Sequence, residues 1–82
     1  MMGNSNNVGN NTQSSLDLQA ERLKSAYRAM TSTQRGTLIS RIQDALGGQS
    51  YYAVYNKILK GRWPNRQVEI AIRELEGMTN NF

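Results

Sequence analysis

Apolar side chains recur at helical spacing along most of this chain, and turn-forming residues interrupt the pattern at short intervals. Leu16, Leu23 and Met30 would share one face of a helix, and the same kind of spacing returns in three later segments. No segment shows the sustained alternation of apolar and polar residues that indicates a strand. Helices with one apolar face bury it by packing on one another. The sequence therefore predicts an all-α fold, a compact four-helix domain.

Capping residues and glycines set the predicted boundaries of the four helices. The first three helices are predicted over residues 16–30, 33–46 and 51–60, and the fourth between Asn65 and Gly77. Ser, Thr and Asn side chains accept hydrogen bonds from the free N–H groups of a first helical turn. We predict such N-caps at Ser15, Thr31, Ser50 and Asn65, with Gln34 completing a capping box at Thr31. Gly47, Gly48 and Gly61 can adopt the positive φ that ends a helix.

The 82 residues leave room for one small domain. Residues 1–15 are rich in asparagine, contain two glycines and carry no charge, so they cannot bury enough apolar surface to offset their ordering entropy. We therefore predict a disordered tail over residues 1–15, a helical domain over residues 16–78 and a short C-terminal tail over residues 79–82. An N-terminal arm that enters a minor groove is the alternative, but such arms usually carry Arg or Lys, and this segment has neither.

The chain contains no cysteine and no histidine, which removes disulfides, thiolate nucleophiles, imidazole bases and the usual zinc ligands. The six acidic residues form no recognisable catalytic constellation, so we expect no enzyme activity, no metal and no cofactor. No segment approaches the roughly 18–20 apolar residues of a membrane span, and the N-terminus lacks the apolar core of a signal peptide. We expect a cytoplasmic protein with no membrane partner.

The positive charge of the chain is concentrated in one segment. Between Asp44 and Glu69 there is no acidic residue, while four basic residues supply as much charge as the net +4 of the whole chain: Lys57, Lys60, Arg62 and Arg66. A local excess of positive charge favours an anionic partner. A helix that carries polar and aromatic side chains between a glycine turn and a basic loop is suited to a nucleic-acid groove.

This segment resembles the helix-turn-helix of bacterial and phage repressors, of the Cro/repressor-like and LacI-like N-terminal types. In those groups the recognition helix similarly starts at a small hydroxyl residue and closes with an apolar pair, a polar residue and glycine. Ser50 and the run 58–61 match this pattern, and the likeness extends from about Gln34 to Leu75. The turn after Leu46 is one residue longer than usual, and the displayed face lacks Gln and Arg. The resemblance thus implies a helix-turn-helix and a DNA-binding regulator, without a particular base specificity.

Side-chain chemistry suggests a role for each exposed residue of the predicted recognition helix. Asn pairs with adenine through two hydrogen bonds, apolar groups contact the thymine methyl group, and Lys and Arg bind phosphates. The predicted base contacts are Ser50, Tyr52, Ala53, Asn56 and Lys57. The predicted phosphate contacts are Arg35, Lys60, Arg62 and Arg66.

Each of these interpretations has a simpler structural alternative. Tyr51 and Tyr55 have apolar-face spacing, so we predict them in the core rather than at a ligand. Trp63 is expected to cover the apolar edge beside the last helix, and stacking on a base is the other option. Asn56 would be an ordinary surface residue, and Lys57 with its basic neighbours an ordinary solvated face, if no DNA is bound.

Taken together, the residues and the resemblance predict a non-enzymatic helix-turn-helix protein that binds double-stranded DNA, a transcriptional regulator of the repressor kind. A domain this small offers few base contacts, so we expect specificity to need a homodimer or tandem sites. A helical protein-interaction module that docks its Tyr/Lys face onto an acidic partner is the main alternative. A third hypothesis is binding of single-stranded nucleic acid or RNA through Tyr52 and Trp63.

Overall fold

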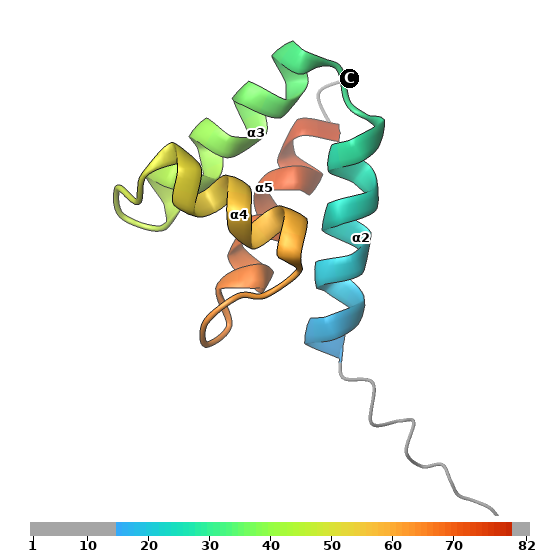
Figure 1. Ribbon diagram of the computed structural model, residues 1–82, viewed down its shortest axis with the longest axis vertical. Coiled ribbons are helices and arrows are strands. Elements are labelled where there is room, and N and C mark those ends of the chain that lie inside the picture. Colours follow the sequence, from blue (N-terminus) through green and yellow to red (C-terminus); the bar gives the residue numbers. More distant parts are fainter. Residues whose placement is uncertain (1–14, 80–82) are drawn as a thin grey trace, which may run out of the picture.

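The computed structural model describes residues 15–79, and Figure 1 shows these residues as four α-helices. The helices are α2 (Ser15–Ala29), α3 (Ser32–Ala45), α4 (Tyr51–Lys60) and α5 (Gln67–Thr79). No strand occurs among the described residues. The prediction of a compact all-α domain with four helices is therefore confirmed. The tail predicted over residues 1–15 lies outside the described residues except for Ser15, and so does residue range 80–82.

α5 packs against both α2 and α3, and α4 packs across the same two helices from the other side. α2 and α3 are joined by a short turn, and the end of α5 lies close to that turn (Figure 1). α4 crosses near the C-terminal end of α3, to which the turn at residues 46–50 connects it. This arrangement leaves one long face of α4 at the surface.

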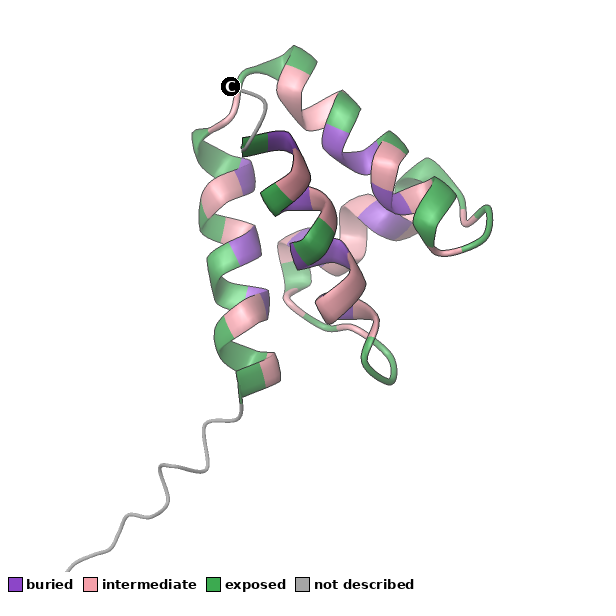
Figure 2. Ribbon diagram, turned by 180° about the vertical axis from the view of Figure 1, so that it is seen from behind, coloured by how far each residue is buried: buried purple, intermediate pink, exposed green. Residues whose placement is uncertain are grey.

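The apolar faces of all four helices meet in a single core. Figure 2 shows the buried segments on the inner sides of the helices. No polar or charged residue among residues 15–79 is buried. The core residues are Ala20, Leu23 and Tyr27 of α2, Leu38, Ile39 and Ile42 of α3, Val54 and Ile58 of α4, and Val68, Ala71, Ile72, Leu75 and Met78 of α5.

Local capping interactions fix the start of α3 and both ends of α4 as predicted, whereas α3 spans Ser32–Ala45 and lies one residue earlier than the predicted range 33–46. The Gln34 N–H donates to Thr31 Oγ1 at 3.2 Å, and the Thr31 N–H donates to Gln34 Oε1 at 3.0 Å, which completes the capping box. Ser50 Oγ accepts from the Ala53 N–H at 3.1 Å, and α4 covers the predicted residues 51–60. Gly61 ends α4 in the left-handed conformation with φ of 67°.

Three predicted helix ends were wrong. Ser15 is the first residue of α2 and not its N-cap. Asn65 has a φ of 51°, whereas an N-cap residue has extended backbone, and α5 begins two positions later at Gln67. Gly77 does not stop α5, which continues to Thr79, because Met78 is buried in the core and stabilises the last turn.

Candidate nucleic-acid interface

α4 presents three side chains in a row on the face opposite its buried residues. Val54 and Ile58 are fully buried. Residues four positions apart lie on the same face of a helix, and Tyr52, Asn56 and Lys60 follow this spacing on the outer side of α4. Tyr52 is 69% exposed, Lys60 is exposed and Asn56 is partly exposed. We call Tyr52, Asn56 and Lys60 the exposed row.

Aromatic contacts support the exposed row from behind. The rings of Tyr52 and Tyr55 stack with centroids 6.0 Å apart, and Tyr55 meets Tyr27 of α2 edge to face at 6.3 Å. Tyr27 is buried, and burial raises the pKa of its hydroxyl above the ordinary value. Tyr55 is partly buried against the core. A series of ring contacts, one stacked and one edge to face, thus connects the exposed Tyr52 to the interior.

Tyr51 does not lie in the core, so this part of the sequence prediction was wrong. Tyr51 is 51% exposed. It occupies the first turn of α4, at the edge of the packed face whose centre is held by Val54 and Ile58. A tyrosine hydroxyl needs water or another partner, and this edge position leaves Tyr51 in contact with solvent.

The structure places Ser50 and Ala53 together at the start of α4, next to Tyr52. The Ser50 hydroxyl oxygen is occupied by the N-cap hydrogen bond, but its O–H remains a donor. Ser50 is exposed and Ala53 partly exposed. Four of the five predicted base contacts, Ser50, Tyr52, Ala53 and Asn56, therefore lie on or beside one surface.

Lys57, the fifth, is directed along the flank of α4. Its Nζ donates to Gln67 Oε1 at 3.0 Å and also contacts Gln49 Oε1. Gln43 Nε2 in turn donates to the Gln49 carbonyl oxygen at 3.0 Å. These bonds connect α3, the turn before α4, α4 itself and the first residue of α5. Lys57 thus holds both ends of the α4 region in place, and no carboxylate among residues 15–79 pairs with its charge.

Arg35 also has a structural role, at the C-terminal end of α2. Its Nε donates to the Tyr27 carbonyl oxygen at 2.9 Å and its Nη2 to the Arg28 carbonyl oxygen at 2.7 Å. Its guanidinium lies 5.2 Å from the centroid of the Tyr27 ring. Carbonyls in the last turn of a helix lack partners within the helix, so Arg35 satisfies the C-terminal end of α2. The structure brings Arg35 to α2 and not to the exposed row.

The ion pairs are separated from α4. Every acidic partner lies on α2 or α5, and α4 has no acidic residue. Lys57, Lys60 and Arg62 form no ion pair with any residue in the range 15–79. The ion pairs of this range are Arg22–Glu76 at 3.1 Å, Lys24–Glu21 at 3.5 Å, Arg41–Glu74 at 3.1 Å and Arg66–Glu69 at 2.7 Å.

Arg66 differs from the other predicted phosphate contacts because it has a carboxylate partner. Its Nε and Nη2 donate to the two Glu69 oxygens at 2.8 and 2.7 Å. These hydrogen bonds lower the pKa of Glu69 and raise that of Arg66 relative to their ordinary values. A phosphate would have to replace Glu69 to bind Arg66, whereas Lys60 and the exposed Arg62 need no such exchange.

The glutamines that hold Lys57 and the backbone carbonyls that hold Arg35 were not predicted from the sequence. Gln49 and Gln67 lie eight and ten positions from Lys57, and no local pattern links residues at those separations.

Among residues 15–79, no group of three or more metal-ligating side chains gathers in one place. None of the helices described there is both long enough and apolar enough to cross a bilayer. A scan of protein-family models and searches of curated proteins and of solved structures found no match to this chain.

Proposed function

We propose that this protein binds double-stranded DNA, with α3, the turn at residues 46–50 and α4 acting as a helix-turn-helix. In this proposal α4 enters the major groove, where Tyr52 and Asn56 of the exposed row face the bases and Lys60 faces a phosphate. The chain acts as a transcriptional regulator of the repressor kind. The observation that carries the proposal is the separation of charge. The glutamates are paired on α2 and α5, while Lys57, Lys60 and Arg62, on α4 and the loop after it, have no carboxylate partner in the described part of the chain.

The dimensions of α4 suit a major groove. A helix of 10 residues is about 15 Å long at 1.5 Å per residue, and a B-DNA major groove about 12 Å wide accepts one helix. Tyr52 and Asn56 lie toward the start of α4, the part of a recognition helix that contacts base edges in this motif. Lys60 and Arg62 lie at its end, where the groove wall supplies phosphates.

Each residue of the interface has a distinct proposed role. Asn56 donates to and accepts from an adenine, and the Tyr52 ring contacts a thymine methyl group. Lys60 and Arg62 neutralise phosphates, which positions the helix without reading sequence. Lys57 contributes its charge and holds the turn and the loop on either side of α4 through Gln49 and Gln67. Two copies on half-sites about one helical turn apart would supply specificity that one small domain lacks.

The exposed tyrosines favour one other candidate function, a protein-interaction surface. Tyr51 and Tyr52 are large, 51% and 69% exposed, and adjacent on the first turn of α4. Tyrosine is enriched among residues that dominate protein interfaces, and the neighbouring lysines would select an acidic partner. This candidate differs from DNA binding in its dependence on salt and on duplex structure.

A fluorescence-anisotropy titration of labelled duplex DNA between about 50 and 200 mM salt tests the proposal. The test variant is Lys60→Gln/Arg62→Gln, and the matched control is Arg22→Gln/Arg73→Gln. The control removes the same charge from the α2 and α5 side of the molecule. We expect the slope of log K against log salt to fall by about 1.8 in the test variant, because two phosphate contacts are lost at about 0.9 each. The control should keep the wild-type slope.

Two results would count against DNA binding by α4. Equal loss of affinity in both double variants would indicate a general charge effect without a defined interface. If the wild-type protein shows no salt-dependent binding to duplex DNA, α4 does not bind in the major groove. The protein-interaction surface is then the better hypothesis.

A further inference from the structure

Two glutamines beside Lys57 carry amide donors that no group in the described part of the chain accepts. Lys57 Nζ donates to Gln67 Oε1 at 3.0 Å and also contacts Gln49 Oε1. An ammonium group can only donate, so each carboxamide must turn its oxygen toward Lys57 and its NH₂ group away from it. Neither Nε2 atom donates to another atom among residues 15–79. Lys57 therefore fixes the direction of two unused donors.

Both amide nitrogens are open to solvent. Within the range 15–79, Trp63 Nε1 is the side-chain nitrogen or oxygen that is both buried and without a hydrogen bond. The Nε2 atoms of Gln49 and Gln67 also lack a hydrogen bond there, so they cannot be buried. The two Oε1 atoms contact the same nitrogen and lie within about 6 Å of each other, twice a hydrogen-bond length. The two amide groups therefore border one small area of surface around Lys57.

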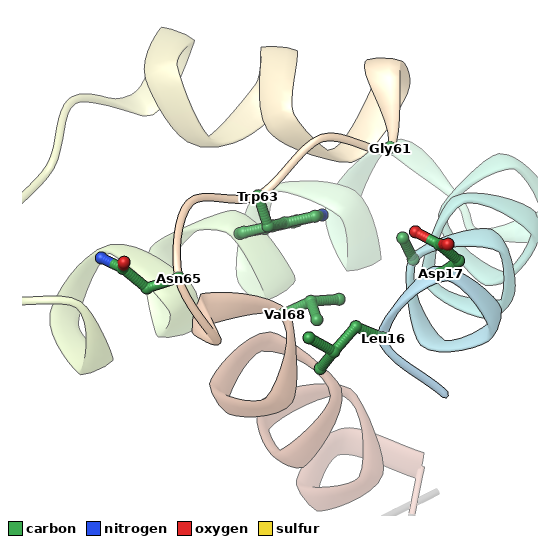
Figure 3. Close-up of a pocket in the computed structure, with 7 residues that line it drawn as sticks. Leu16, Asp17, Gly61, Trp63, Asn65 and Val68 are labelled. Atoms are coloured by element: carbon green, nitrogen blue, oxygen red, sulfur yellow. The ribbon is translucent and has the colours of Figure 1, made fainter. Parts of the chain in front are cut away.

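Neighbouring elements hold both glutamines in position. Gln49 lies in the turn before α4, where its carbonyl oxygen accepts from Gln43 Nε2 at 3.0 Å. Gln67 is the first residue of α5, and the loop that leads to it contains Trp63, which packs against the core. Figure 3 shows the Trp63 ring on the inner side of this loop, over Val68. The backbone on which each amide donor stands is thus supported by other parts of the domain.

The charges near the two glutamines favour an anion. Lys57 supplies a positive charge, and no carboxylate among the described residues pairs with it. Glu69 lies two positions after Gln67, but Arg66 holds its carboxylate through hydrogen bonds of 2.8 and 2.7 Å. Lys60 follows Lys57 by three positions and is its neighbour on the surface of α4. Glutamine side chains are among the common donors to phosphate oxygens in protein–DNA complexes.

We propose that Gln49 and Gln67 bind the phosphate backbone of duplex DNA through their Nε2 groups, with Lys57 as the residue that positions them. This inference rests on the proposed function, with α4 as the DNA-binding helix. It adds contacts from the turn before α4 and from the start of α5. Phosphate contacts fix the orientation of a protein on the duplex without reading sequence. The two glutamines therefore set the angle at which α4 enters the groove.

Substitution of glutamine by glutamate separates this contact from the structural role of the side chains. Glutamate keeps an acceptor for Lys57, but it has no N–H donor and repels a phosphate. In anisotropy titrations at about 100 mM salt, we expect Gln49→Glu and Gln67→Glu each to weaken binding of duplex DNA at least about tenfold, as for the loss of one hydrogen bond to a charged group. Gln19→Glu adds the same charge on the α2 and α5 side and should change the affinity less than about twofold.

The side-chain signals of the glutamines report the contact directly. In ¹H–¹⁵N spectra, the NH₂ signals of Gln49 and Gln67 are identified by their loss in the corresponding glutamate variants. Both should shift on addition of duplex DNA, whereas the NH₂ signal of Gln19 should not. Amide exchange in residues 47–50 should be no faster in the variants than in the wild type, because Lys57 keeps its acceptors. Faster exchange would assign the weaker binding to a loosened turn and overturn the proposal.

The outcomes distinguish the glutamine contacts from DNA binding itself. Wild-type affinity in both glutamate variants would overturn the glutamine contacts alone, provided that Lys60→Gln/Arg62→Gln still reduces the salt dependence. An equal loss of affinity in Gln19→Glu would indicate a general effect of charge and would also overturn them. Failure of the wild-type protein to bind duplex DNA would overturn both proposals.

Discussion

Replacing Arg35 by Lys should destabilise the protein although the charge is kept. Arg35 donates from two different nitrogens, at 2.9 Å to the Tyr27 carbonyl and at 2.7 Å to the Arg28 carbonyl, and its flat guanidinium lies 5.2 Å from the Tyr27 ring centroid. A lysine ammonium is a single point charge that cannot reproduce this fork. If Arg35 were only a phosphate contact, lysine could replace it without loss of stability. A loss of stability therefore indicates a structural role for Arg35.

The magnitude follows from the contacts that are lost. A hydrogen bond with a charged partner contributes about 1.5–3 kcal/mol, with the lower end applying to a partly exposed site, and the cation–π contact about 0.5–1 kcal/mol. Lysine retains part of this, so we expect a loss of about 1.5 kcal/mol in the free energy of unfolding. For a domain of this size, 1 kcal/mol corresponds to about 4–8 °C in Tm, which gives a decrease of about 6–12 °C.

Thermal unfolding followed by circular dichroism measures this difference directly. Arg28→Lys is the matched control, because Arg28 is exposed and its side chain has no ion pair or hydrogen bond with residues 15–79. The control should unfold within about 2 °C of the wild-type protein, as expected for surface substitutions. A Tm of Arg35→Lys as close to the wild type as that of the control would refute the assignment of Arg35 to the end of α2.

Three further substitutions test individual parts of the structure. Ser50→Ala should lower the free energy of unfolding by about 1 kcal/mol in urea titrations, because the N-cap of α4 is lost. Ser40 lies on the exposed side of α3, and an equal effect of Ser40→Ala would contradict the capping role of Ser50. Lys57→Met should speed amide hydrogen exchange in residues 47–50 about fivefold, since a local constraint of about 1 kcal/mol is removed; unchanged exchange there would show that the glutamine contacts do not hold the turn. Because the pKa of Tyr27 is raised in the folded protein, the unfolded state releases this proton first as the pH rises above about 10. Stability should then fall more steeply with pH in the wild type than in Tyr27→Phe, and parallel pH profiles would argue against the shift.

The parts of the fold that depend on neighbouring residues were predictable from the sequence. The bounds of α4 and the capping box of α3 follow from Ser50, Gly61 and Thr31, whose partners lie within the same turn. The all-helical core followed from apolar spacing alone. In the candidate site, the outward positions of Tyr52 and Lys60 follow from the same period.

The parts that depend on distant contacts were not predictable. Gly77 continues α5 with its backbone close to the Arg41 side chain, where an added Cβ would lie 2.6 Å from Nη2, and no pattern near Gly77 indicates this neighbour. Lys57 and Arg35 were predicted to contact DNA, and each donates two hydrogen bonds to partners seven to ten positions away. Long cationic side chains reach many acceptors, so sequence spacing on a helix fixes their starting direction and not their partner.

Amide chemical-shift mapping with a duplex of about 20 base pairs shows whether the exposed row of α4 contacts DNA. We expect the largest shifts to fall within residues 50–62, with Tyr52, Asn56 and Lys60 at their centre. Arg22 and Arg73, on the α2 and α5 side, should change little. Largest shifts on α2 and α5, or an unchanged spectrum at low salt, would show that α4 does not form the DNA interface.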